Sequence, residues 1–302
     1  MTFKRFSLFV GIILPSTSWA AATTKFSSLV VFGDSFTDNG NGSYTITNGT
    51  WPLAVYDQGR FSNGPVWAEN VASNLSIPLY DYAYGGATTS NVLVQGYTGA
   101  KSDVAVPGIA EQVDSFLKTN NTSISFETTL FALLGGFNDI FFNTNLTSAQ
   151  IAASLSGSLT KLVNAGAQHI LLLHYYDATQ IPYDTYADPV TKEVLLKFSE
   201  DYPKQLSLLA SGFRQQLAGK TSESSLTYVD FLPLYRSFYY YGTPTKYGFK
   251  TLGAYGSCLT GAYGETANIT QCSDPDKMVF WDEYHPSGRT HQIMADYILS
   301  KL

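Results

Sequence analysis

The sequence predicts an α/β fold built around a parallel sheet that helices cover on both faces. Short, almost continuous apolar segments alternate with longer segments whose apolar residues recur at helical spacing. Continuous apolar strands are typical of a sheet that is buried on both faces, as parallel sheets are. The chain has 302 residues, of which 44% are hydrophobic and 14% charged, so it can build the core of one sizeable domain.

Five apolar runs are predicted strands, and each is bounded by a change in composition. In chain order they are residues 29–32, 77–84, 129–134, 169–173 and 226–231. The first run ends in Gly33-Asp34-Ser35, and the second and third end in glycine pairs. Glycine and small polar residues mark turns, and ligands bind outside the carboxyl ends of parallel strands. We therefore expect a binding site where these corners meet.

Five segments with apolar residues at helical spacing are predicted helices. They are residues 65–75, 109–117, 148–165, 190–217 and 286–302. Pro203 is expected to divide the fourth helix into two pieces, because proline lacks an N–H and clashes with the preceding turn. Pro286 suits the first turn of the last helix. Residues 232–284 are rich in Tyr and Gly, and we expect them to form long loops over the rim of the sheet rather than a second domain.

The N-terminus has the features of a secretory signal. Two basic residues precede a short apolar run, and Ser18-Trp19-Ala20 supplies the small residues that a signal peptidase needs. The run is too short for a permanent membrane anchor. We therefore expect a signal peptide at residues 1–20 and one secreted, extracellular domain at residues 21–302.

Possible modifications agree with secretion. Seven Asn-X-Ser/Thr sequons make glycosylation candidates of Asn41, Asn48, Asn74, Asn120, Asn121, Asn145 and Asn268. Some sequons are expected to stay unmodified, since a chain this rich in Asn, Ser and Thr contains several by chance. The two cysteines, Cys258 and Cys272, enclose a short loop, and a disulfide is their expected state in an oxidising compartment. Two cysteines without further ligands cannot form a structural zinc site.

Charge and motif content exclude several partner classes. The net charge is −6 and no block of Lys or Arg occurs, so a nucleic-acid partner is not expected. No phosphate-binding loop and no metal-ligand spacing is visible, and we expect no cofactor and no metal. No segment suggests an obligate partner surface, so a monomer is expected.

Ser35 is either an ordinary turn residue or a nucleophile. Alone, Gly-Asp-Ser is a weak signal, because all three residues are turn formers. Near the C-terminus, Asp282 and His285 lie three residues apart, just before a predicted helix. A tight turn there lets the carboxylate accept a hydrogen bond from one imidazole nitrogen while the other nitrogen faces a nucleophile. Asp is also common in turns, so this pair is moderate evidence by itself.

Two further corners carry groups that can stabilise an oxyanion. The amide of Asn138 follows the third strand and can donate to a developing negative charge. The corner at Gly85 lets a backbone N–H approach a substrate oxygen, because glycine has no Cβ. Taken singly, each corner is better explained as an ordinary strand-to-loop turn.

Together the four segments resemble the SGNH (GDSL-type) hydrolases, in order and in context. Gly33-Asp34-Ser35, the Gly85 corner, Asn138-Asp139 and Asp282-x-x-His285 carry the resemblance, which covers essentially the whole chain after the signal peptide. Residues 59–64 resemble a segment common among secreted eukaryotic members. Within the superfamily the chain looks most like the fungal secreted acetylesterases of carbohydrate esterase family 16. The resemblance implies a flavodoxin-like three-layer α/β/α sandwich with a five-stranded parallel sheet.

The resemblance also implies a role for each matching residue. Ser35 is the expected nucleophile, His285 the general base and acid, and Asp282 the carboxylate that orients it. The expected oxyanion hole consists of the backbone N–H groups of Ser35 and Gly85 and the side-chain amide of Asn138. Gly86 is the alternative to Gly85, because the glycine pair leaves the alignment ambiguous by one residue. Tyr84 stands where many relatives carry Ser, which puts that local contact in doubt but not the backbone role.

These roles imply a serine esterase, expected to hydrolyse acetyl esters of plant cell-wall carbohydrates such as hemicellulose-derived oligosaccharides. A lipase or phospholipase acting on longer acyl esters is the alternative, although the Tyr-rich loops look too polar for an acyl groove. A carbohydrate-binding protein without catalysis is a third hypothesis. The Gly-x-Ser-x-Gly elbow of the α/β-hydrolases is absent from the sequence.

Other titratable residues are expected to be structural. Asp34 should fix the turn around Ser35, and Asp139 should brace its own corner. His174 ends the fourth strand, with no Asp near it in the orienting pattern. His169 begins that strand at the opposite end of the sheet, and His291 is expected to face solvent or the sheet. Two carboxylate pairs could suggest a glycosidase, namely Asp38 with Asp57 and Asp274 with Asp276. Nothing in the sequence ties either pair to a common site.

Overall fold

The computed structural model describes residues 25–119, 124–221, 223–263 and 268–302. The predicted signal peptide, residues 1–20, lies outside the described residues. Within the described ranges, no helix has the length and apolar character needed to cross a membrane.

A five-stranded parallel sheet lies at the centre of the fold, as predicted, with the strand order β2-β1-β5-β6-β7. The strands are β1 (Ser28–Gly33), β2 (Leu79–Asp81), β5 (Thr129–Leu134), β6 (His169–His174) and β7 (Ser225–Asp230). Every residue of β1, β5 and β6 is buried, which explains their continuous apolar sequences.

The edge strand β2 is shorter than the predicted residues 77–84. It pairs with β1 only from Leu79 to Asp81. The Asp81 carboxylate then accepts the backbone N–H groups of Ala83 and Asn39, at 2.8 and 3.1 Å. These bonds turn the chain out of the sheet, so the residues that follow form the corner that carries Gly85.

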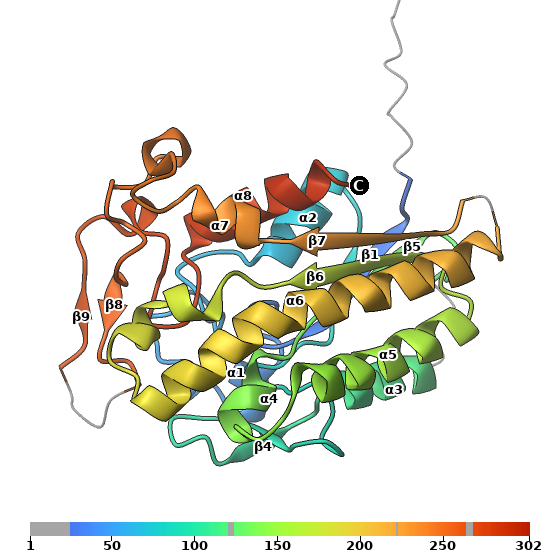
Figure 1. Ribbon diagram of the computed structural model, residues 1–302, viewed down its shortest axis with the longest axis horizontal. Helices are drawn as coiled ribbons and strands as arrows, with labels where there is room; N and C mark the ends of the chain where they lie inside the picture. Colours follow the sequence, from blue (N-terminus) through green and yellow to red (C-terminus); the bar gives the residue numbers. More distant parts are fainter. Residues whose placement is uncertain (1–24, 120–123, 222, 264–267) are drawn as a thin grey trace, which may run out of the picture.

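Helices cover both faces of the sheet and form the predicted three-layer sandwich. Figure 1 shows α2 (Trp67–Leu75), α7 (Leu232–Arg236) and α8 (Gly288–Leu299) on one face. On the other face lie α3 (Ile109–Lys118), α5 (Ser148–Asn164) and α6 (Pro189–Ala218). The short helices α1 (Ser43–Ile46) and α4 (Phe137–Phe142) lie in the connections after β1 and β5.

Helix α6 is one continuous helix of 30 residues, so the prediction that Pro203 divides it is wrong. Residues buried on one face, such as Phe198, Tyr202 and Leu206, keep three- and four-residue spacing through the proline. Packing of this continuous face against the rest of the fold outweighs the single backbone hydrogen bond that proline removes.

The last helix starts later than predicted. Helix α8 begins at Gly288, and the Ser287 hydroxyl caps it by accepting the Thr290 N–H at 3.2 Å. Pro286 does not lie in the first turn, because it forms an isolated β-bridge with Phe280 instead. This bridge folds residues 280–286 into the tight loop that carries Asp282 and His285.

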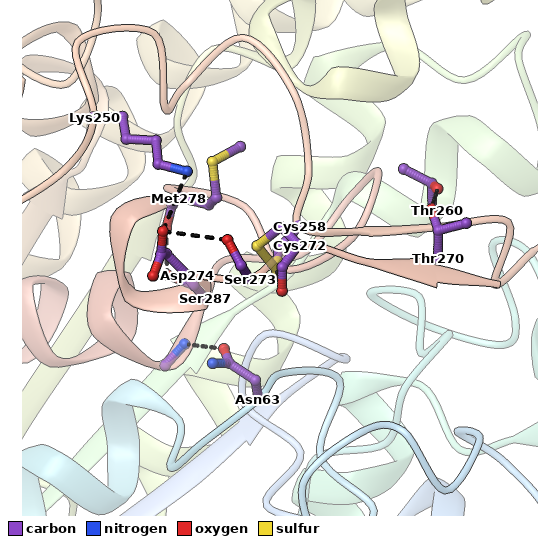
Figure 2. Close-up of a disulfide and its surroundings, with 11 residues drawn as sticks. Asn63, Lys250, Cys258, Thr260, Thr270, Cys272, Ser273, Asp274, Met278 and Ser287 are labelled. Carbon is purple, nitrogen blue, oxygen red and sulfur yellow. Dashed lines mark hydrogen bonds and ion pairs between the residues drawn. A yellow bond between two sulfur atoms is a disulfide. The ribbon is translucent and has the colours of Figure 1, made fainter.

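Residues 232–284 consist largely of loops, as predicted, with short elements inserted. These are α7, the 3₁₀ turns η3 (Pro244–Tyr247) and η4 (Pro275–Lys277), and the hairpin of β8 (Leu259–Thr260) and β9 (Thr270–Gln271). The predicted disulfide joins Cys258 to Cys272 at the base of this hairpin (Figure 2). The Cys258 and Leu259 N–H groups donate to the carbonyls of Phe280 and Trp281, so the cross-linked hairpin braces the chain just before Asp282.

The structure describes five of the seven predicted sequon asparagines. The five described ones have exposed asparagines, namely Asn41, Asn48, Asn74, Asn145 and Asn268. Asn120 and Asn121 lie outside the described residues. Exposure is what glycosylation requires, and whether a glycan is attached stays a prediction.

Candidate active site

Ser35 lies just beyond the carboxyl end of β1, in a tightly bonded turn. The backbone N–H and carbonyl of Gly33 both bond to the Gln112 side chain of α3, each at 2.9 Å, which fixes the end of the strand. The Asp34 carbonyl accepts the N–H groups of Thr37 and Asp38, and its side chain accepts the Phe36 N–H at 3.1 Å. Asp34 therefore fixes the turn around Ser35, as predicted.

The Asp34 carboxylate is completely enclosed. The Tyr175 hydroxyl donates to its Oδ2 atom, and the Asn138 amide lies 3.5 Å from the same oxygen. Burial raises the pKa of Asp34 to about 6, although the hydrogen bonds from Tyr175 and the Phe36 N–H oppose this rise. Tyr175 is 141 residues away in the chain, and no local pattern links it to this turn.

Ser35, His285 and Asp282 form a continuous hydrogen-bonded chain. His285 Nε2 lies 2.8 Å from Ser35 Oγ, and His285 Nδ1 lies 2.9 and 2.8 Å from the two oxygens of Asp282. Because Nδ1 faces a carboxylate, it carries the proton of the neutral ring, and Nε2 is left to accept the serine proton. The two halves of this chain are 250 residues apart in sequence.

The Asp282 carboxylate accepts more hydrogen bonds than an ordinary turn residue does. Its Oδ1 atom accepts the N–H groups of Tyr284 and His285, at 2.8 and 2.7 Å. Its Oδ2 atom accepts the hydroxyls of Tyr56 and Tyr263, at 2.7 and 3.3 Å. Burial favours the neutral acid, but attraction to His285 and these hydrogen bonds outweigh it, so the pKa of Asp282 is lowered. The carboxylate stays ionised beside the imidazole.

No sequence signal identifies Tyr56 and Tyr263 as residues of the site. They are two of 21 tyrosines, and neither belongs to a recognisable motif. Tyr263 also lies 3.2 Å from His285 Nδ1 through its hydroxyl. It belongs to the loop of the disulfide-linked hairpin, so that loop contacts both Asp282 and His285.

The segment 59–64 supports the loop that carries His285. The Phe61 ring packs against the imidazole of His285, with centroids 5.2 Å apart. The Ser62 hydroxyl donates to the Pro286 carbonyl at 3.0 Å. The Asn63 side chain accepts the Gly288 N–H at 2.8 Å, which Figure 2 shows as a dashed line. This segment therefore holds the histidine loop and the first turn of α8.

The prediction that Gly85 supplies an oxyanion donor is wrong. Its N–H donates to Asp38 Oδ2 at 2.9 Å, and a Cβ at Gly85 would lie 2.2 Å from the Phe61 ring. Gly86 lines the cavity that contains Ser35. Within the described residues, no hydrogen bond uses the Gly86 N–H. The alternative alignment therefore fits this geometry, and Gly86 becomes the predicted oxyanion donor of the glycine corner.

Asn138 lies where the sequence predicts it, at the start of α4 and on the wall of the same cavity. Its amide donates to the Ala87 carbonyl at 2.9 Å, which leaves a second amide hydrogen for a ligand. Asp139 accepts both the N–H and the hydroxyl of Thr89, at 2.9 and 2.5 Å. Asp139 thereby ties the Asn138 corner to the glycine corner, which confirms its bracing role.

A cavity of about 390 Å³ opens over Ser35. Half of its lining residues carry aromatic rings: Phe36, Trp51, Phe61, Tyr97, Phe137, Phe141, Phe142, Tyr263 and Tyr284. Small residues complete it, namely Thr98, Gly99, Ala100 and Ser102. All four lie at the end of strand β3 (Gly96–Thr98) or in the turn to strand β4 (Val104–Val106). The two strands pair in a hairpin that was not among the elements predicted from the sequence.

The other histidines are structural. His174 Nδ1 lies 2.9 Å from Asp230 Oδ1, because the register of β6 and β7 places these residues side by side. That partner lies on the neighbouring strand, so no local sequence pattern links it to His174. His169 bonds to Ser225 at 3.1 Å. His291 is fully buried and accepts the Trp67 N–H at 3.2 Å, and burial lowers its pKa to about 3.

The two carboxylate pairs that could suggest a glycosidase do not form a site. Asp38 is buried and accepts four backbone N–H groups of the Gly40–Ser43 turn and the Gly85 corner. Asp57 pairs with Arg60 at 3.0 Å, and Asp274 lies 3.7 Å from Lys250 (Figure 2). Among the described residues, no group of three or more His, Cys, Asp or Glu side chains is arranged to hold a metal ion.

Nearly all of the described chain matches a known family. The family model of the GDSL-like Lipase/Acylhydrolases matches residues 29–298. The chain belongs to this family. As a GDSL-like acylhydrolase it is a carboxylic ester hydrolase, which argues against the hypothesis of a binding protein without catalysis.

Relatives of this GDSL-like hydrolase share its length to different extents. The thermolabile hemolysin of Vibrio parahaemolyticus is 28% identical over 300 residues, which cover 94% of this chain and 66% of the hemolysin. A GDSL esterase/lipase of Arabidopsis thaliana is 26% identical, over 97% of both chains. Among solved structures, a lipolytic protein of the G-D-S-L family from Veillonella parvula has a TM-score of 0.46 at 16% identity, covering 90% of this chain and 96% of that one.

Proposed function

We propose that the protein is a secreted, monomeric serine esterase that removes acetyl groups from plant cell-wall carbohydrates, in the manner of the acetylesterases of carbohydrate esterase family 16. The observation that carries the proposal is the Asp282–His285–Ser35 hydrogen-bonded chain at the floor of a cavity that also presents Asn138 and Gly86. A nucleophile, a base with its orienting carboxylate and oxyanion donors are what acyl transfer requires.

The proposed reaction has two halves. Ser35 Oγ attacks the ester carbonyl while His285 Nε2 takes its proton, and Asp282 stabilises the imidazolium that forms. The Ser35 and Gly86 N–H groups and the Asn138 amide donate to the tetrahedral oxyanion. The oxyanion collapses, the C–O bond breaks, and His285 returns the proton to the departing alcohol. Water then attacks the acyl-serine with the same assistance and releases acetate.

The cavity suits a small acyl group on a sugar. Its aromatic rings offer flat apolar faces to the C–H faces of a pyranose, and the tyrosine, threonine and serine hydroxyls offer hydrogen bonds to sugar hydroxyls. Its volume of about 390 Å³ is in the range of a small-molecule site. An acetylated sugar residue is therefore our preferred substrate.

One observation favours a second candidate, an esterase for longer acyl chains. Phe137, Phe141 and Phe142 line the cavity, and the rings of Phe137 and Phe141 lie 5.4 Å apart. These rings could bind an alkyl chain as well as a sugar face. The relatives include proteins named as esterase/lipases, which fits this candidate equally.

A series of p-nitrophenyl esters tests the proposal. We expect the highest kcat/KM for acetate, with a steep fall from butyrate onward, together with acetate release from acetylated xylo-oligosaccharides. A preference for octanoate or longer chains, with hydrolysis of triacylglycerol, would replace the acetylesterase by the lipase.

A further inference from the structure

A second cavity, of about 350 Å³, lies outside the site described above. We call it the tyrosine groove. Tyr239, Tyr241 and Tyr255 supply its aromatic surface, and Arg236, Gln180 and Thr185 are among its polar lining residues. Two segments form it: the loops after helix α7, and the two 3₁₀ turns η1 (Ala178–Gln180) and η2 (Pro182–Thr185).

Two of the three groove tyrosines, Tyr239 and Tyr255, are held in place by hydrogen bonds. Tyr241 is 95% exposed and Tyr255 is 51% exposed, which is unusual for large aromatic side chains. The Tyr239 hydroxyl donates to the Gln180 carbonyl at 2.7 Å, and the Tyr255 hydroxyl accepts the Tyr240 N–H at 3.2 Å. The rings of Tyr239 and Tyr255 pack edge to face, 5.4 Å apart. A ligand that stacks on these rings therefore meets a surface that is already ordered.

Arg236 adds unused hydrogen-bond donors. It is exposed at the end of α7, and within the described part of the chain its guanidinium makes no hydrogen bond or ion pair. It is the one charged residue among the described residues that line the groove. Five N–H donors beside flat aromatic rings match a ligand with hydroxyls on its edge and C–H groups on its face.

Of the ligand classes considered, a carbohydrate chain fits the tyrosine rings and the Arg236 guanidinium best. An alkyl chain would cover the guanidinium of Arg236 without offering it a hydrogen-bond acceptor, at a cost in desolvation. A nucleic acid would stack on the rings, but a chain of net charge −6 with one groove cation offers little attraction to phosphates. A pyranose chain uses both the rings and the donors.

Tyr183 links the segment that forms the tyrosine groove to the loop beside the active-site cavity. Tyr183 lies in η2, between groove residues, and its N–H donates to the Glu283 carbonyl at 3.0 Å. Its ring stacks 4.8 Å from the ring of Tyr284, which lines the cavity over Ser35. Tyr183 and Tyr284 thus connect the chain segment that forms the tyrosine groove to the wall of the active-site cavity.

We propose that the tyrosine groove is a second carbohydrate-binding site, which holds part of the glycan chain away from the acetyl group that Ser35 removes. This inference rests on the proposed function for its choice of glycan. It also makes a separate claim, that binding energy for long substrates is supplied outside the catalytic cavity.

The test compares long and short substrates in the full chain. The double variant Tyr241→Ala with Arg236→Ala should raise KM for acetylated xylohexaose by about tenfold or more and leave its kcat unchanged. The same variant should bind deacetylated xylohexaose about tenfold more weakly by calorimetry. Hydrolysis of p-nitrophenyl acetate should stay at the wild-type rate, because that ester does not reach the groove. Tyr241 is almost wholly exposed, so its removal does not threaten folding.

Tyr186→Ala is the matched control, since Tyr186 is an exposed tyrosine (56%) that lines neither cavity. It should leave xylohexaose binding unchanged. If the double variant binds and deacetylates xylohexaose as the wild type does, the groove proposal is overturned and the acetylesterase stands. If the wild type binds xylohexaose through the groove but releases no acetate, the groove stands and the proposed function fails. If the wild type neither binds nor deacetylates it while cleaving p-nitrophenyl acetate, both fail.

Discussion

Tyr56 offers a sharp test of how the buried carboxylate of Asp282 is held. Tyr56→Phe removes one hydroxyl and keeps the ring, which packs 6.2 Å from both Phe61 and Trp281. The lost hydrogen bond is 2.7 Å long and joins a side chain that is 4% exposed to one that is fully buried. A hydrogen bond to a charged group contributes about 1.5–3 kcal/mol, so the free energy of unfolding at pH 7 should fall by about that amount.

The pH dependence of this loss follows from the sign of the pKa shift. The Tyr56 hydroxyl helps to lower the pKa of Asp282 in the folded protein. A carboxyl group with a lowered pKa adds stability above its unfolded pKa and loses it as the pH falls through the folded pKa. The difference between wild type and Tyr56→Phe should therefore be equal at pH 5 and pH 8, and should shrink only below about pH 4.

Urea unfolding of both proteins at several pH values measures the effect. Tyr263→Phe is the matched control, because its hydroxyl lies 3.3 Å from Asp282 and is shared with His285. Tyr263→Phe should lower the free energy of unfolding by less than Tyr56→Phe does. Two results would contradict this role of Tyr56. One is a Tyr56→Phe variant with the same free energy of unfolding as the wild type, and the other is a loss of that free energy that grows as the pH falls from 8 to 5.

Three further predictions concern other parts of the fold. Asn138→Ala should lower kcat by roughly 10²–10³-fold while the circular dichroism spectrum and thermal midpoint stay close to wild type. Replacing both Cys258 and Cys272 by Ser should lower the free energy of unfolding by about 3 kcal/mol for a loop of this size, read from denaturant titrations; no loss would contradict the cross-link. The pKa of Asp34 is raised to about 6, so wild type should lose up to roughly 3 kcal/mol relative to Asp34→Asn as the pH rises from about 4 to 6, and a flat difference would count against this burial effect.

Features that depend on neighbouring residues could be predicted from the sequence. Strands β1, β5 and β6 are almost continuous apolar runs, and burial on both faces is what produces such runs. Asp282 and His285 are close in sequence, so their hydrogen bond follows from a single turn. Ser35 directly follows a strand, and the sheet delivers it to the rim that His285 also reaches.

Features that depend on contacts across the fold could not be predicted. Tyr56 reaches Asp282 from 226 residues away, and His174 finds Asp230 only through strand register. Pro203 was expected to break α6, but burial of a continuous face outweighs its local effect. The choice between Gly85 and Gly86 depended on Asp38, whose carboxylate engages the first glycine and leaves the second facing the cavity.

The most direct test of the account is labelling of the native protein with a small organophosphonate, followed by peptide mass analysis. We expect one label per chain, on Ser35, with loss of ester hydrolysis in proportion to labelling and no label in Ser35→Ala. A label on another residue, or hydrolysis of p-nitrophenyl acetate by Ser35→Ala at the wild-type rate, would contradict it.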